Sequence, residues 1–288
     1  MTRHLVCLSF DFDAFSGWIA RGLTTPTPMS RGEFGAIGAE RILALLEKYN
    51  IHTTWFIPGV TIGTYPEICG RVAGAGHEIG NHGWTHTPPT KLTPTTEDTD
   101  LERANYAIQR LSGISVKGYR SPSWDLSPHT IQLLIKHGFL YDSSMMGNDH
   151  HPYRARYEDK IAQDGVLQFG PKTDLIEMPI SWTLDDYPYF EFVRTETTIL
   201  PGLSIAENVL KNWVDDFSFM RKTETWGVLT YTFHPFVIGR GHRMIILEKL
   251  IQKLIDVGAI FTTMGAAAQE FLEREPPTSP QKQTEGSE

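Results

Sequence analysis

The 288-residue sequence contains only two cysteines, Cys7 and Cys69, and both stand among apolar residues. Two cysteines in such settings argue against a disulfide-stabilised extracellular scaffold and are typical of a reducing compartment. The first ten residues pass from a short polar lead directly into an apolar run and lack the small-residue cleavage site of a signal peptide. We therefore expect a cytoplasmic protein.

Long hydrophobic runs and basic clusters are also missing. No apolar stretch reaches the ~18 residues that a membrane-spanning helix needs, so we expect no membrane segment. The chain has 26 Lys and Arg against 34 Asp and Glu, a formal net charge of −8, and its basic residues form no stripe. Because binding to phosphates requires such a basic surface, the sequence argues against a nucleic-acid partner.

What the sequence does contain is a regular alternation of apolar runs and helical segments. Such alternation indicates parallel βαβ units, and seven or eight strands without a break in composition favour one α/β barrel domain, residues 1–274. Residues 275–288 lack apolar side chains and predict a disordered tail. The expected strands are 5–10, 52–59, 77–81, 116–120, 139–144, 175–181, 227–235 and 260–264, and the expected helices are 39–49, 66–76, 95–112, 127–138, 205–221 and 243–257.

Two aspartates, Asp11 and Asp13, follow the first apolar run and are separated by Phe12. Residues two apart on a strand point to the same side, so both carboxylates face one space at the strand's carboxyl end, where barrel active sites lie. Two close negative charges are unfavourable unless a cation or a shared proton relieves them. The pair indicates either a metal site or acids that cap the turn after the strand.

Two histidines four residues apart, His82 and His86, follow the third apolar run. A turned or helical segment would bring both imidazoles to one ion. A carboxylate on the same rim, such as Asp13, would complete the two-histidine, one-carboxylate set of hydrolytic zinc sites. Such a pair also arises by chance, but its place beside the aspartates favours the metal interpretation.

Two further segments follow strands on the same rim. Arg120 in the segment GYRSPSW is a fixed positive charge that can keep a carboxylate ionised, and Pro122 stiffens the turn. Alternatively, Arg120 forms a purely structural ion pair. His234 ends the run 227–233 and suits either a general acid at the rim or a histidine whose hydrogen bonds are satisfied in the core.

Together the four segments resemble, in the same order, the motifs of the polysaccharide deacetylase family, the NodB-homology group of carbohydrate esterases. SFDFD at 9–13 is similar to the family's Thr-Phe-Asp-Asp, and HGWTH at 82–86 to His-(Ser/Thr)-x-x-His. RSPSW at 120–124 matches Arg-x-Pro-x-Trp, and TFH at 232–234 is similar to Leu-x-His. The resemblance spans about residues 5–265 and implies a distorted (β/α) barrel of seven or eight strands.

The resemblance implies a metal-dependent hydrolase of non-peptide carbon–nitrogen bonds that removes an N-acetyl group from a sugar. It implies one divalent ion per chain, with zinc the best match. A carboxylate should support the general acid, and three candidates stay open: Asp142, Asp185 and Asp186. The implied catalytic residues are Asp11 as base, His234 as acid and Arg120 as the residue that keeps Asp11 ionised, and the implied metal ligands are Asp13, His82 and His86.

The match has two departures. Phe12 separates two aspartates that are adjacent in most family members, and Gly83 stands where Ser or Thr is usual. The segment 181–192, SWTLDDYPYFEF, is closer to a cytoplasmic branch that includes cyclic imide hydrolases and allantoinase-like proteins. Ring opening of a small imide or ureide is therefore an alternative function, and a non-catalytic ligand-binding barrel is another. The branch also implies a homotetramer.

The substrate site on the rim is expected to use side chains that stack on, or hydrogen-bond to, a sugar ring or a planar imide. Rim aromatics also serve packing alone, so their contact role stays open, as does the choice of substrate. The expected substrate-binding residues are Trp18, Trp84, Pro122, Trp124, Trp182, Asp185 and Tyr187.

Overall fold

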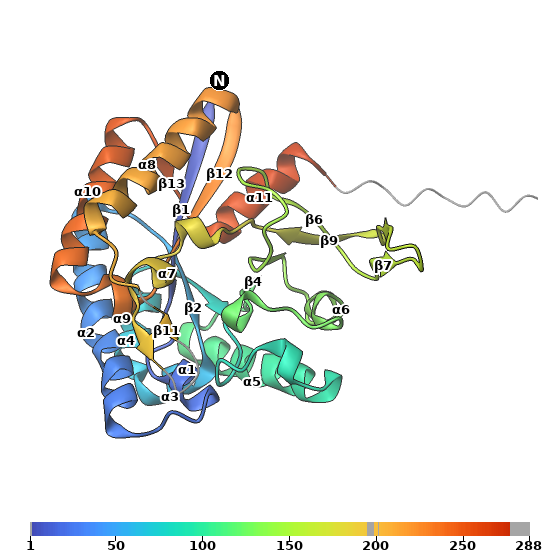
Figure 1. The fold of residues 1–288 in the computed structure, drawn as a ribbon, viewed down its shortest axis with the longest axis horizontal. Helices are drawn as coiled ribbons and strands as arrows, with labels where there is room; N and C mark the ends of the chain where they lie inside the picture. The colour runs from blue at the N-terminus through green and yellow to red at the C-terminus, as the bar shows by residue number, and fades with distance from the viewer. Residues whose placement is uncertain (1, 195–198, 201, 277–288) are drawn as a thin grey trace, which may run out of the picture.

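The computed structural model describes residues 2–194, 199–200 and 202–276, and its main sheet curls into an open barrel (Figure 1). The main sheet has nine strands: β1 (Arg3–Asp11), β2 (Thr54–Ile57), β3 (Glu78–Asn81), β4 (Gly118–Tyr119), β5 (Tyr141–Asp142), β6 (Tyr153–Arg156), β9 (Lys172–Glu177), β12 (Trp226–Phe233) and β13 (Ile260–Phe261). Their order is β12–β1–β2–β3–β4–β5–β9–β6, with β13 also paired to β1. All pairs are parallel except β6–β9, which confirms the predicted α/β class and distorted barrel.

Irregular chain, and not a strand pair, fills the gap between β12 and β6. The backbone N–H of Val228 donates to the carbonyl of His150 at 2.8 Å. Further along β12, the N–H of Asp186 donates to the carbonyl of Thr232 at 3.1 Å, and Asp185 forms an isolated bridge to Thr232. The barrel is therefore open, and the chain that covers its edge carries two aspartates to the carboxyl end of β12.

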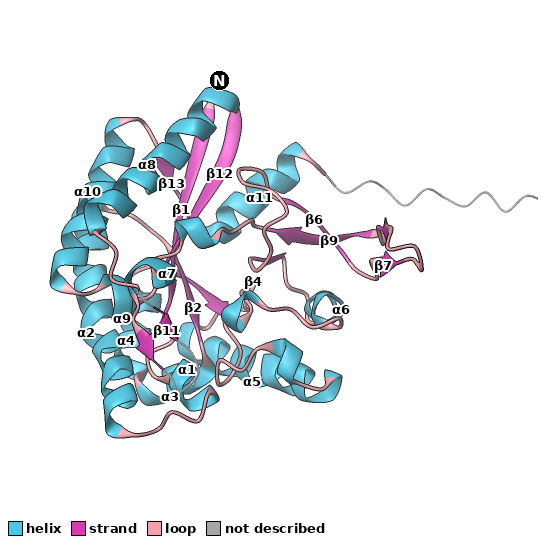
Figure 2. Ribbon diagram, in the orientation of Figure 1, coloured by secondary structure: helices cyan, strands magenta, loops and turns pink. Residues whose placement is uncertain are grey.

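The helices lie around the sheet, with α2, α8 and α10 along one side and the β6–β9 pair projecting on the other (Figure 2). Two small hairpins complete the strands: β7 (Lys160–Ile161) with β8 (Leu167–Gln168), and β10 (Val193–Arg194) with β11 (Ile199–Leu200). The helices are α1 (Ser16–Ala20), α2 (Pro26–Tyr49), α3 (Gly59–Thr64), α4 (Pro66–Gly74), α5 (Pro94–Ser112), α6 (Thr130–Lys136), α7 (Tyr187–Phe190), α8 (Ala206–Thr223), α9 (Pro235–Ile238), α10 (Gly241–Asp256) and α11 (Met264–Arg274), with 3₁₀ turns η1 (Pro89–Lys91), η2 (Pro122–Trp124) and η3 (Trp182–Leu184).

Two helix boundaries differ from the predicted ones. The helix predicted at 39–49 begins at Pro26, where proline's fixed backbone angle suits a first helical turn. The helix predicted at 127–138 begins only at Thr130. Ser127 instead forms a turn: its N–H donates to Thr130 Oγ1 at 2.9 Å, and its Oγ accepts from the N–H of His129 at 3.0 Å.

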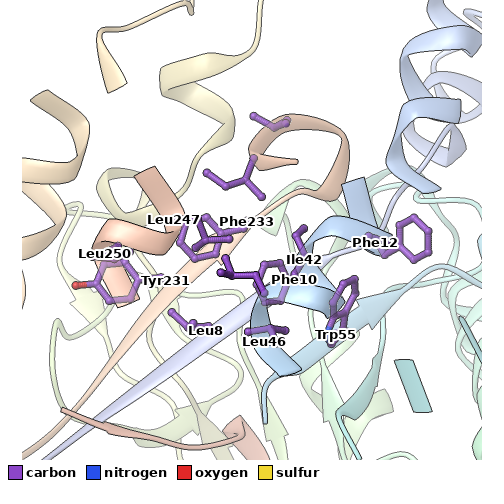
Figure 3. Packing of buried hydrophobic residues seen from close by; sticks show 14 of the residues in the cluster. Leu8, Phe10, Phe12, Ile42, Leu46, Trp55, Tyr231, Phe233, Leu247 and Leu250 are labelled. Atoms are coloured by element: carbon purple, nitrogen blue, oxygen red, sulfur yellow. The ribbon is translucent and has the colours of Figure 1, made fainter. Parts of the chain in front are cut away.

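The side chains of β1 explain why Phe12 separates the two aspartates. Leu8, Phe10 and Phe12 pack on the outer face of the strand against α2, α10 and the neighbouring strands, as Figure 3 shows. The ring of Phe10 stacks on Trp55 with centroids 4.8 Å apart. Burying each such ring stabilises the fold by roughly 1.5–3 kcal/mol. Because strand residues alternate, Asp11 points to the inner side of the barrel, as predicted.

No helix in the described ranges combines the length and the apolar character that a bilayer crossing requires. The last described helix, α11, ends at Arg274, where the barrel domain was expected to end. Beyond Pro276 the predicted tail lies outside the described residues.

Candidate metal centre and active site

Three buried side chains, Asp13, His82 and His86, converge at the carboxyl end of the sheet, and their ligand atoms all lie within 4.8 Å of one another. Asp13 Oδ1 lies 3.3 Å from His82 Nε2, and Asp13 Oδ2 lies 3.3 Å from His86 Nε2. The histidine segment is a tight turn and not a helix, with left-handed φ values of 69° at Gly83 and 60° at His86. The structure thus brings together the three predicted metal ligands.

The hydrogen bonds of this cluster fit a divalent ion. His82 Nδ1 donates to the carbonyl of Arg120 at 2.7 Å, so Nε2 is the ring nitrogen that faces the aspartates. Asp13 Oδ1 is buried without a hydrogen-bond partner among the described residues. Bonds of about 2.0–2.1 Å in a tetrahedral zinc site place ligand atoms roughly 3.3 Å apart, which is the distance between each histidine Nε2 and one oxygen of Asp13. Burial alone would raise the pKa of Asp13, but His86 and His82 outweigh it and hold that pKa well below its ordinary value.

Gly83 differs from the family's usual Ser or Thr for a steric reason. At its φ of +69°, a Cβ would lie 2.9 Å from Asp100 Oδ2. That oxygen accepts a hydrogen bond from the N–H of Trp84 at 2.8 Å, so Asp100 is held in place. Glycine therefore lets the chain turn tightly between the two histidines while Asp100 anchors the turn.

Asp11 lies beside the cluster and is paired with Arg120. Arg120 Nη1 donates to Asp11 Oδ1 at 2.7 Å and to Ser9 Oγ at 2.8 Å, while Nε donates to the carbonyl of Ser143 at 3.1 Å. The guanidinium is fully buried, so its charge is little screened. The second oxygen of Asp11, Oδ2, stays 3.8 Å from His82 Nε2. This is the arrangement expected of an ionised base held next to a metal site.

Asp186 supports His234, which resolves the choice among the three candidate carboxylates. His234 Nδ1 donates to Asp186 Oδ1 at 2.8 Å, and Nε2 lies 3.9 Å from Asp13 Oδ2. Burial alone would lower the pKa of His234, but Asp185 and Asp186 raise it well above its ordinary value. Asp142 lies elsewhere, where its Oδ1 accepts from Ser144 Oγ at 2.6 Å.

Asp185 is a buried carboxyl at the edge of the same site. Its Oδ1 accepts from the N–H of Tyr187 at 2.7 Å and lies 3.6 Å from His234 Nδ1. Burial raises its pKa to about 8, with His234 opposing and Asp186 reinforcing the shift. Asp185 therefore places a second carboxyl beside the His234–Asp186 pair, at the edge of the pocket.

A pocket of about 160 Å³ opens onto these groups. One wall is the stacked pair Trp124 and Trp182, with ring centroids 4.0 Å apart. Ser123 and Trp124 both hold left-handed φ values, 60° and 55°, a strained backbone of the kind found at functional sites. The lining residues are Asp11, Asp13, Arg21, His82, His86, Ser123, Trp124, Trp182, Asp185, Tyr187 and His234.

Comparisons with known proteins identify relatives of this chain by sequence and by fold. The sequence profile described as polysaccharide deacetylase matches residues 36–141. A peptidoglycan deacetylase from Helicobacter pylori is 36% identical over 286 residues, which cover 94% of this chain and 97% of that protein. This chain belongs to the polysaccharide deacetylase family. Membership makes it a hydrolase of amide bonds.

Further relatives share most of the length of this deacetylase-family protein. The peptidoglycan deacetylase-like protein FGM2 from Gibberella zeae is 29% identical and covers 94% of this chain and 87% of its own. A Mycobacterium smegmatis crystal structure, assigned to the polysaccharide deacetylases, has a TM-score of 0.83 at 30% identity, covering 97% of this chain and 95% of that one. The PuuE allantoinase structure has a TM-score of 0.80 at 20% identity, covering 96% and 93%, a likeness of fold alone.

Three of the predicted substrate-binding residues of this deacetylase-family protein do not line the pocket: Trp18, Trp84 and Pro122. Trp18 is only 4% exposed and packs against Phe236. The ring of Trp84 lies beneath the guanidinium of Arg103, at 4.1 Å. The other four predicted residues, Trp124, Trp182, Asp185 and Tyr187, do line it.

Sequence reasoning missed two lining residues, Arg21 and Ser123. Ser123 lies inside the segment RSPSW, which resembles the family's third motif. Arg21 directly follows the short helix α1 and lies outside every motif. Nothing in its spacing indicated that it would reach the site.

Proposed function

We propose that this protein is a divalent-metal-dependent deacetylase that removes the N-acetyl group from an amino sugar. One observation carries the proposal: Asp13, His82 and His86 converge beside the Asp11–Arg120 and His234–Asp186 pairs in one pocket. The name of the Helicobacter pylori relative, a peptidoglycan deacetylase, supports a saccharide as substrate.

Asp13, His82 and His86 would hold the ion, for which zinc fits the two-imidazole, one-carboxylate set best. When bound, such an ion supplies Lewis acidity and lowers the pKa of water from about 15.7 to about 7. The buried, unpartnered Oδ1 of Asp13 supports this ligand set over a purely hydrogen-bonded cluster.

Asp11 and His234 transfer protons on either side of the scissile amide, and Arg120 and Asp186 hold them in position. Asp11 accepts a proton from the attacking water, and Arg120 holds Asp11 Oδ1 so that Oδ2 faces the pocket. His234 donates a proton from Nε2 to the leaving nitrogen, because an amine leaves poorly as an anion. Asp186 fixes the imidazole through Nδ1 and stabilises its protonated form. General acid and base groups of this kind each contribute about 10²–10⁴-fold in rate.

The test begins with protein purified without chelator, in which bound metal is measured. The same sample is then incubated with an N-acetylated sugar oligomer, and released acetate is quantified. We expect one zinc-class ion per chain and acetate release that a chelator abolishes and added zinc restores. A protein that binds no metal and releases no acetate even after zinc is added would support the non-catalytic barrel instead.

A second candidate is ring-opening hydrolysis of a small cyclic imide or ureide. The small volume of the pocket, about 160 Å³, and its wall of two stacked indoles favour it. The same zinc-loaded sample is assayed on a cyclic imide in parallel. Imide opening without acetate release from the sugar would assign this function. The predicted homotetramer is tested on that sample by light scattering.

A further inference from the structure

Arg21 holds a distinctive place in the pocket. It is the only Lys or Arg among the described lining residues, and its side chain is exposed. Within the described part of the chain, its guanidinium has no ion pair. It stands at the end of α1, which follows directly from the aspartate segment.

The face of the Trp18 ring contacts the guanidinium of Arg21. Arg21 Cζ lies 5.5 Å from the centroid of the Trp18 ring, a distance typical of cation–π contacts. Arg31 also lies near this ring, at 5.0 Å, but Arg31 is paired with Glu191. Phe236 packs edge-on against the same ring and helps to bury it. Trp18 was expected to stack on substrate, but in the structure it positions Arg21.

The acids of the pocket do not need Arg21 as their counter-charge. Asp11 is paired with Arg120, and Asp13 lies between His82 and His86. Asp185 Oδ1 lies 3.6 Å from His234 Nδ1 and accepts a hydrogen bond from the N–H of Tyr187. The positive charge of Arg21 is therefore available to a ligand. A guanidinium binds carboxylates through two parallel N–H···O bonds.

We propose that Arg21 binds a carboxylate of the substrate, so that the protein prefers an N-acetylated amino sugar with a nearby carboxylate over its neutral counterpart. This inference rests on the proposed deacetylase function. The pocket volume of about 160 Å³ is below the ~300–1,000 Å³ of sites that enclose a whole small ligand. Arg21 and the three proposed metal ligands line this one small pocket, so the carboxylate that Arg21 binds would lie on a substituent close to the amide. Arg21 sets specificity and does not take part in bond cleavage.

The test compares two substrates that match in size and differ in charge: N-acetylmuramic acid and its carboxamide, in which the carboxylate is converted to an amide. Zinc-loaded wild-type protein should have a kcat/KM about tenfold higher for the acid, a preference that falls as salt is added. Arg21→Gln should abolish the preference by raising KM for the acid about tenfold relative to KM for the carboxamide. Arg21→Lys should retain part of it, because a lysine keeps the charge but loses the two-pronged geometry.

Arg103→Gln is the matched control, since Arg103 also covers a tryptophan but lies outside the pocket lining. It should leave the preference unchanged. Equal kcat/KM for the two substrates, unaffected by Arg21→Gln, would overturn the inference and leave the deacetylase function standing. Release of acetate from neither compound, nor from the N-acetylated sugar oligomer, by zinc-loaded wild-type protein would contradict the proposed function itself, and the inference with it.

Discussion

The carboxylate of Asp186 accepts two hydrogen bonds from His234, one from its backbone N–H at 3.0 Å and one from Nδ1 at 2.8 Å. Both residues are buried. The pair fixes the ring orientation and the tautomer, so that Nε2 faces the space beside Asp13. Asp186 acts through His234 and is a positioning residue.

Replacing Asp186 with Asn should lower kcat about 10²–10³-fold, because an amide can present its NH₂ to Nδ1 and favour the wrong imidazole tautomer. Bound metal should stay at the wild-type level, since the metal ligands lie on other segments. Steady-state kinetics together with metal analysis measure both. A variant with wild-type kcat would remove Asp186 from the account.

Gly83→Ala should destabilise the fold by about 1–2 kcal/mol and weaken metal binding. The new Cβ has an unfavourable left-handed φ of +69° and meets Asp100 Oδ2 at 2.9 Å. Gly70→Ala in α4 is the matched control, because its Cβ meets nothing within 4 Å and alanine favours a helix. Thermal unfolding should rank the variants with Gly70→Ala at or above wild type. A Gly83→Ala protein as stable as wild type would contradict the steric explanation.

His77 should make the protein less stable in mild acid. Burial, reinforced by His52, lowers the pKa of His77 to about 4, and Nδ1 accepts a hydrogen bond from the N–H of Thr53 at 3.2 Å. Because the pKa is about 6.5 in the unfolded chain, the unfolded state binds more protons between pH 4 and 6.5. The stability that neutral His77 contributes is complete above about pH 6.5 and is lost as pH falls toward 4.

The test is His77→Asn, which keeps an acceptor for Thr53 but does not titrate. The fall in Tm between pH 7 and pH 5 should be smaller in this variant than in wild type by about 2 °C, which corresponds to about 1 kcal/mol. His242→Asn, at an exposed position, should leave the fall unchanged. An equal fall in His77→Asn and wild type would show that this histidine does not drive the acid sensitivity.

Much of the site could be predicted because its residues follow strand ends. Alternation along β1 places Asp11 and Asp13 on one side and Phe12 on the other, and parallel strands bring their carboxyl ends together. Each of the eight predicted strand runs contains or overlaps a strand of the main sheet. Local pattern and topology alone were enough for these features.

Other features depend on packing that no short pattern encodes. Trp18 and Trp84 do not line the pocket, and an arginine guanidinium lies over each ring. Arg21 reaches the pocket because it directly follows α1, and Asp186 reaches His234 through an irregular segment that runs beside β12. The antiparallel β6 and the open edge of the barrel likewise arise inside a stretch without clear periodicity.

The central claim is that Asp11 acts as the base and Asp13 as a metal ligand. One measurement tests this claim most directly: the metal content of Asp11→Asn and Asp13→Asn, purified side by side without chelator and assayed for acetate release. We predict that Asp11→Asn keeps about one ion per chain and loses turnover, because Asp11 is held by Arg120 and serves as the base. Asp13→Asn should lose both, because the ion would lose its only carboxylate among the three proposed ligands. Loss of the ion in Asp11→Asn, with its retention in Asp13→Asn, would reverse the two roles and contradict the account.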